Sequence, residues 1–193
     1  MLLARLRILL LSCLILGACS ATKVFPGVGD HWHTPYGFYI CDRWVGGEVG
    51  LRETDKDGNP TNKVVGIYHV HGHDDGLMHW HPSTNAAGGT NATLGLYLSF
   101  YEIRIDDWQL DLPDYLGGPA LEGVTVCDTP KGQVDGELAV HVYEPGSTEP
   151  TIYTENLAGT LLNLDGRIVA VVFGPPGLNP GRPPYSDVAP QDQ

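Results

Sequence analysis

The sequence predicts a mostly β fold (α+β), with antiparallel sheets, a histidine-bearing hairpin and one main helix. The 193 residues include 25 glycines and 15 prolines, which interrupt helices and favour turns. Short apolar runs of strand length lie between these turn residues. Only one segment has the clear apolar period of an amphipathic helix.

The histidines form the most unusual pattern in the chain. Seven of the eight fall between residues 31 and 81, in sets spaced by two. These sets are His31 and His33; His69, His71 and His73; and His79 and His81. Spacing by two places side chains on one face of a β-strand, and imidazole is a common metal ligand. The pattern therefore predicts a metal-binding sheet face.

The segment 67–81 has the pattern of a β-hairpin, and its turn decides whether the histidines meet. A two-residue turn would place His71 opposite Trp80 and split the histidines between two faces. A three-residue loop over 74–76, closed by its glycine in the left-handed conformation, would place His71 opposite His79. Opposed Cβ atoms are then ~4.5–5.5 Å apart, so that three or four imidazoles can converge on one ion. We expect the three-residue loop.

The expected metal ligands are the hairpin histidines outside the turn. They are His69, His71, His79 and His81. His31 and His33 can supply ligands from a third strand or form a second site, whereas His73 at the turn is expected to take no part. Asp30 either orients an imidazole or is a turn residue after Gly29. All-nitrogen ligation favours zinc or copper. The alternatives are a proton-sensing cluster, which would lose stability as pH falls through ~6.5, or no role.

The first nineteen residues have the pattern of an export signal. Two arginines precede an apolar run over 8–16 that is too short to span a bilayer. The tetrapeptide Leu-Gly-Ala-Cys at 16–19 resembles the lipobox of bacterial lipoproteins. The resemblance implies a signal peptide over 1–18 and a Cys19 that carries acyl chains such as palmitate. The mature chain would then be lipid-anchored on the outer face of the cell membrane, or to the outer membrane where one exists.

With this leader removed and Cys19 acylated, Cys41 and Cys127 are the only free thiols, each at the end of an apolar run. In an oxidising compartment two such cysteines predict a disulfide, which contributes ~4–5 kcal/mol on the chain-entropy model. The alternative is a copper site in which one cysteine joins two histidines with Met78 as a weak axial ligand. It is disfavoured because Met78, with even parity, points away from the histidine face.

The second half of the chain predicts one helix followed by strands. The helix begins near 90–91, and its apolar face comprises Leu94, Tyr97, Leu98 and Tyr101. Strands are expected over 108–112, 121–127, 137–143 and 167–173, with a turn at 165–166 before the last. We expect one domain over 19–173, with a histidine-rich half (28–86) and a helix-plus-sheet half (90–173). A proline- and glycine-rich tail, extended or disordered, is expected over 174–193.

The formal net charge is −12, and it becomes −14 without the two arginines of the leader. Such an acidic surface repels nucleic acid and anionic headgroups, so membrane contact is expected through lipid alone. The same charge raises the local concentration of cations.

The run Asp-His-Trp-His-x-x-Tyr-Gly-x-Tyr-x-Cys over 30–41, followed by paired His-x-His, is similar to a group of histidine-rich exported bacterial proteins. The resemblance implies no activity. The expected function is an exported metal-binding module for capture, buffering or delivery. Alternatives are a hydrolase or hydratase with three histidines and a water on the metal, or an interaction domain with structural metal. We favour the module because the enzyme needs a general base, and only Asp30, Asp74 and Asp75 are near in sequence.

Overall fold

A computed structural model describes residues 26–46, 70–71 and 76–187, and for 70–71 the backbone alone. The predicted mostly β fold with antiparallel sheets is confirmed. Its centre is a seven-stranded sheet with the order β11-β10-β12-β1-β4-β3, and β2 pairs with β1 beside this path. The strands are β1 (Trp32–Ile40), β2 (Arg43–Val45), β3 (Val70–His71), β4 (Leu77–Trp80), β10 (Glu137–Tyr143), β11 (Thr151–Tyr153) and β12 (Ile168–Gly174).

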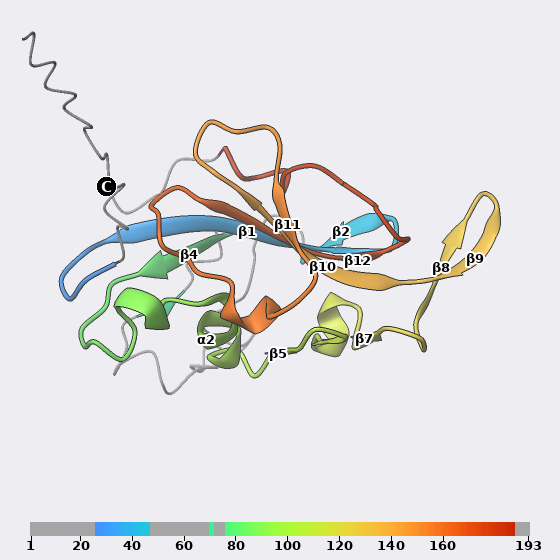
Figure 1. Cartoon of the computed structure of the whole chain (residues 1–193). Helices are drawn as coiled ribbons and strands as arrows, with labels where there is room; N and C mark the ends of the chain where they lie inside the picture. The colour runs from blue at the N-terminus through green and yellow to red at the C-terminus, as the bar shows by residue number, and fades with distance from the viewer. Residues whose placement is uncertain (1–25, 47–69, 72–75, 188–193) are drawn as a thin grey trace, which may run out of the picture.

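The sheet combines strands from both halves of the chain. β1 pairs in parallel with β12, whereas the other strand pairs of the sheet, among the described residues, are antiparallel. A parallel neighbour needs a long crossover, which here runs through the helix and the two smaller sheets. Those sheets comprise β5 (Arg104–Ile105), β6 (Gln109–Asp111) and β7 (Ala120–Leu121), and β8 (Val126–Thr129) and β9 (Gly132–Asp135). In Figure 1, α2, β5 and β7 lie on one side of the large sheet, and β8 and β9 project beyond its end.

The α-helix of the described residues, α2 (Leu94–Ser99), is short and starts later than predicted. The Oγ1 atom of Thr93 caps it by accepting a hydrogen bond from the N–H of Leu96 (3.2 Å). Residues 89–91 form the 3₁₀ turn η1 (Gly89–Asn91). Further 3₁₀ turns are η2 (Asp114–Leu116) and η3 (Leu157–Gly159). The predicted apolar face is buried at Leu94, Tyr97 and Leu98. No helix of the described ranges is long and apolar enough to cross a membrane.

The predicted strands are found with one correction. β10 matches the predicted range 137–143, and β12 and β6 match theirs closely. The single strand predicted over 121–127 is wrong, because β7 ends at Leu121 and β8 begins at Val126. Gly123 has a φ of +71° there, and the Oε1 atom of Glu122 accepts a hydrogen bond from the N–H of Leu138 (2.7 Å). The turn redirects the chain away from the large sheet.

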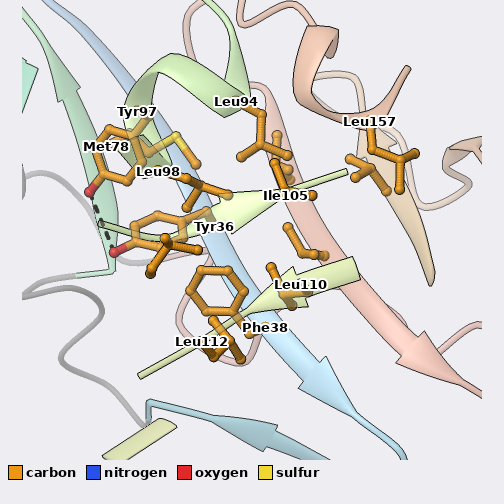
Figure 2. Packing of buried hydrophobic residues seen from close by; sticks show 14 of the residues in the cluster. Tyr36, Phe38, Met78, Leu94, Tyr97, Leu98, Ile105, Leu110, Leu112 and Leu157 are labelled. Carbon is orange, nitrogen blue, oxygen red and sulfur yellow. Dashed lines mark hydrogen bonds between the residues drawn. The ribbon is translucent and has the colours of Figure 1, made fainter. Parts of the chain in front are cut away.

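Alternate residues of β1 and β4 face opposite sides of the sheet. On the inner side, Tyr36, Phe38 and Met78 pack against Tyr97 and other apolar residues of the main core (Figure 2). The hydroxyl of Tyr97 donates a hydrogen bond to that of Tyr36 (3.4 Å), and burial raises the pKa of Tyr97 well above its usual value. This side holds the sheet and helix together.

The outer side is covered in part by the C-terminal stretch. Residues 175–187 contain no helix or strand, but they pack on the sheet through Tyr185, which is 7% exposed. Gly76, with a φ of +76°, leaves the space for that ring, since a Cβ there would lie 2.3 Å from Cδ2 of Tyr185. Gly37 is less confined, because its Cβ would lie 3.1 Å from the Tyr185 hydroxyl. Of the two glycines, Gly76 is the one that this packing requires.

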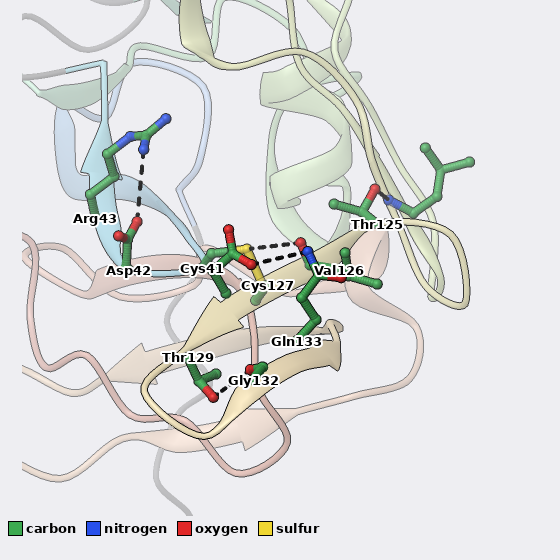
Figure 3. The surroundings of a disulfide bond; sticks show 11 residues. Cys41, Asp42, Arg43, Thr125, Val126, Cys127, Thr129, Gly132 and Gln133 are labelled. Carbon is green, nitrogen blue, oxygen red and sulfur yellow. Dashed lines mark hydrogen bonds and ion pairs between the residues drawn. A yellow bond between two sulfur atoms is a disulfide. The ribbon is translucent and has the colours of Figure 1, made fainter.

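The predicted disulfide between Cys41 and Cys127 is confirmed, with Cα atoms 5.1 Å apart (Figure 3). It ties the end of β1 to β8 across a sequence separation of 86 residues. The N–H of Cys41 also donates to the carbonyl of Phe173 in β12 (2.7 Å). Because both sulfurs are in the disulfide, the alternative of a copper site with a cysteine thiolate is wrong.

Candidate metal centre

Three adjacent strands bring histidines into one row across the sheet. His33 of β1 pairs with His79 of β4, and His79 pairs on its other side with His71 of β3. The predicted opposition of His71 and His79 is confirmed. The three-residue loop that was predicted to produce this opposition is described only at its last residue. Gly76 has the expected left-handed φ, and residues 74–75 lie outside the described residues. For His71 the structure describes the backbone alone.

His31, His33 and His79 form a group whose ligand atoms, one from each side chain, all lie within 4.8 Å of one another. The ring centroids are 4.5 Å apart for His31 and His33, and 4.9 Å apart for His33 and His79. Nitrogen ligands lie ~2.0–2.1 Å from zinc, so tetrahedral ligand atoms are about 3.3 Å apart. Small side-chain rotations thus suffice for all three to bind one ion. The sequence left the role of His31 and His33 open, and the structure joins this pair to the hairpin.

His81 lies beside this group. Its ring centroid is 3.7 Å from that of His31 and 6.3 Å from that of His79. The β1–β4 register explains the contact with His31, because paired residues sum to 112, as do 31 and 81. His81 therefore begins a second row, parallel to the first. The remaining expected ligand, His69, lies outside the described residues, as does His73, which was expected to take no part.

The three grouped imidazoles differ in burial. His79 is fully buried (0% exposed), His33 is half-buried and His31 is exposed. The buried ring is held by the strands on either side of it, whereas the exposed ring lies where the chain enters β1. An ion held by these three ligands would sit at the edge of the protein surface.

The backbone of His33 is anchored by a turn that sequence reasoning did not connect to the site. The N–H of His33 donates to Oδ1 of Asp165 (2.8 Å), and the N–H of Gly166 donates to the carbonyl of His33 (2.8 Å). The Asp-Gly pair was predicted only as a turn before the last strand. Asp30 behaves as a turn residue, since its Oδ2 accepts from the N–H of Gly27 (2.6 Å). The signal that was present in the sequence, an Asp-Gly turn, carried no information about its distant partner.

A cleft of about 360 Å³ opens beside the centre, and His33 lines it. Asp165, Ser186 and Asp187 lie along the same cleft together with Arg182. Nη2 of Arg182 donates to Oδ1 of Asp187 (2.7 Å). The cleft therefore brings carboxylates from the last strand's turn and from the C-terminal stretch next to a predicted ligand. These carboxylates lie far in sequence from the histidines.

No protein-family model, curated protein or solved structure matches this chain. What the centre can do therefore follows from its own geometry: three imidazoles where the start of β1 pairs with β4, one buried and one exposed, with a polar cleft on one side. Cys19 and the predicted signal peptide over 1–18 lie outside the described residues.

Proposed function

We propose that this chain is an exported, lipid-anchored protein that binds a transition metal, zinc or copper, through His31, His33 and His79. Its role would be to capture, buffer or deliver that metal. One observation carries the proposal: the imidazoles of His33 in β1, of His79 in the paired strand β4 and of His31 just before β1 have ligand atoms within 4.8 Å of one another. His81, whose ring centroid lies 3.7 Å from that of His31, is one candidate for a fourth ligand, and His71, opposite His79 in the backbone register, is another.

Several properties support metal exchange at the cell surface. Imidazole ligands without thiolate suit zinc and copper(II). The net charge of −12 concentrates cations around the protein. The exposed position of His31 gives an ion access to solvent. The disulfide agrees with an oxidising compartment, and the lipobox at residues 16–19 supports anchoring by lipid.

The test is metal analysis of the protein purified without a histidine tag. We expect close to one zinc or copper ion per chain, and its loss in the double variant His31→Ala with His33→Ala. His31 is exposed and His33 half-buried, so this variant is expected to fold, which circular dichroism checks. The matched control is His141→Gln, a buried histidine outside the group. Retention of stoichiometric metal in the double variant would reject the centre.

A second double variant, His71→Ala with His79→Ala, locates the centre on the hairpin. Loss of metal in both double variants means that the strands share one ion. Loss of metal in His71→Ala with His79→Ala alone would assign the metal to the hairpin. It would contradict the proposed role of His31 and His33. Melting with and without EDTA also separates exchange from a structural role, because a metal that holds the fold raises the melting temperature strongly.

The cleft beside His33 favours one other candidate function, a metal-dependent hydrolase or hydratase. Three histidines would leave a coordination position for water, whose pKa a zinc ion lowers to about 7. Asp165 or Asp187 would accept the proton from that water. Hydrolysis of p-nitrophenyl acetate by the zinc-loaded protein tests this function. A rate above that of free zinc, lost in Asp187→Asn but with metal retained, would support it; a rate equal to free zinc rejects it for this ester.

A further inference from the structure

Four histidines flank one pair of tryptophans where β1 and β4 meet. Trp32 pairs with Trp80 in the strand register, and both side chains pack on the main core. Because side chains alternate along a strand, the residues on either side of each tryptophan face the outer side of the sheet. These residues form the four-histidine patch: His31, His33, His79 and His81. Their imidazoles therefore project from one face, opposite the tryptophan pair.

The backbone hydrogen bonds show which side chains of the patch lie closest together. The N–H of Tyr36 donates to the carbonyl of Gly76, so this residue of β1 bonds towards β4 (3.0 Å). The N–H and the carbonyl of His33 instead bond to residues 165–166 (2.8 Å each). His33 and His79 thus form a non-hydrogen-bonded pair, in which opposed Cα atoms are only ~4.5 Å apart and the side chains are closer.

The pairing is equally close at the other end of the patch. Pair types alternate along an antiparallel ladder, so residues 31 and 81, two positions beyond the first pair, form a pair of the same kind. Just beyond them, the N–H of Gly29 donates to the carbonyl of Pro82 (3.0 Å), which holds the two segments together. The ring centroids of His31 and His81 are accordingly only 3.7 Å apart.

The spacing of the rings allows all four to reach one ion. Around the patch, the ring centroids are 4.5 Å apart for the pair 31 and 33, 4.9 Å for 33 and 79, and 6.3 Å for 79 and 81. Imidazoles bound at right angles, with nitrogens ~2.0 Å from the ion, have centroids ~4.5 Å apart. The first two separations are close to this value. A shift of the His81 ring towards His79 shortens the third and relieves the close contact with His31.

The origin of all four ligands on one face decides the coordination geometry. A tetrahedral ion resting on a sheet face takes three ligands from that face, and its fourth corner points away from the sheet. An imidazole from the same face would have to fold over the ion to reach that corner. A square of four nitrogens needs no such ligand, because its corners all lie at one height above the sheet. Tetragonal nitrogen ligation is typical of copper(II), whereas zinc sites are mostly tetrahedral.

The floor of the patch is held in place. Trp80, which is 2% exposed, donates from Nε1 to the carbonyl of Ala87 (2.7 Å). His79, next to it in β4, is fully buried. On β1, the backbone of His33 is bonded on the side away from β4. Ligands on a backbone held in this way need little ordering when the ion binds, so the strands impose their geometry on the site.

We propose that His81 is the fourth ligand of the centre and that the four imidazoles make the centre selective for copper(II) over zinc. This inference rests on the proposed function, because it names the ion and completes the ligand set of the same site. Copper(II) would bind the four nitrogens in its tetragonal plane, with an axial position that points away from the sheet. Zinc would bind three imidazoles and take a water at its fourth corner.

The test is electron paramagnetic resonance of the full chain, isolated without a histidine tag and loaded with one equivalent of copper(II). Pulsed experiments count the imidazoles in the copper plane, and no substitution is needed. We expect an axial spectrum and four imidazoles. Copper held by three imidazoles overturns this inference and leaves the proposed function standing. Binding of neither copper nor zinc rejects both.

A variant pair tests the role of His81. His81→Gln removes the imidazole, and His141→Gln makes the same change at a buried histidine outside the patch. We expect His81→Gln to hold copper with one imidazole fewer and to lower the ratio of copper affinity to zinc affinity about tenfold or more. In His141→Gln both should equal the wild-type values. Competition with a chromophoric chelator measures the affinities, and circular dichroism checks folding.

Two results with His81→Gln would overturn the inference. Equal losses of affinity for the two metals would remove the selectivity for copper. Four imidazoles still in the copper plane would assign the fourth position to another histidine. Should the variant not fold, the number of imidazoles counted in the wild-type chain decides.

Discussion

The two faces of strands β1 and β4 differ in what they contribute, although their residues alternate along the same backbone. Met78 and Trp80 on the inner face are 0% and 2% exposed and pack in the main core. His79, between them, faces the opposite side and joins the imidazole group. Both faces are buried at this point, but one is apolar and the other carries the imidazole of His79. If the proposed centre binds metal, stability and metal binding should be separable by substitutions one residue apart.

The largest expected effect comes from the disulfide at the end of β1 away from His33. Replacing Cys41 and Cys127 together with serine is expected to lower the free energy of unfolding by ~4–5 kcal/mol, because the unfolded chain regains the freedom of a long loop. Urea unfolding measures this. Metal content of the folded fraction should be unchanged. Its loss would show that the two ends of β1 are coupled.

The next prediction separates the faces directly. Met78→Ala is expected to cost ~2–5 kcal/mol, since it opens a cavity in the main core. It should leave the metal stoichiometry as it is. His79→Ala, one residue further along β4, should abolish stoichiometric metal. Thermal melts and metal analysis of both variants provide the measurement, and the comparison fails if Met78→Ala loses its metal while still folded.

A smaller effect is expected where Tyr185 packs on the outer side of the sheet. Gly76→Ala places a Cβ 2.3 Å from the Tyr185 ring at a φ of +76°, so we expect a loss of ~1–3 kcal/mol from backbone strain, with the displacement of Tyr185 adding to it. Gly29→Ala is the control, because Gly29 has a φ of +92° and no atom of the described residues lies within 4 Å of the added Cβ. Equal losses of stability in the two variants would show that the contact with Tyr185 adds nothing to the cost of the backbone strain.

The smallest effect concerns pH. His141 of β10 is 1% exposed, and its burial lowers its pKa, an effect that a hydrogen bond with Asn179 partly offsets. The unfolded chain therefore binds this proton more readily, so stability falls as pH drops below ~6.5 towards the lowered pKa. His141→Gln should lose less stability on acidification than the wild type. Urea unfolding from pH 7.5 to 5, in EDTA so that metal release does not contribute, measures the difference; parallel curves would contradict it.

Local pattern was sufficient for much of the site. The alternation of His and apolar residues indicated which side of the hairpin carries imidazole, and the Asp-Asp-Gly turn predicted the register in which His71 pairs with His79. The disulfide was predicted because Cys41 and Cys127 are the two cysteines outside the predicted leader and lipobox. These features depend on neighbouring residues or on counting, so one strand or turn suffices to specify them.

The sequence by itself determined strands β6, β10 and β12 and the opposition of His71 and His79 in the hairpin. Only the tertiary structure decided that β1 lies beside β4, which brings His33 to His79, and that Asp165 anchors His33 from 132 residues away. It alone also placed His31 beside His81. The physical reason is that turn geometry is encoded locally, whereas the order of strands depends on how all apolar faces are buried against a common core.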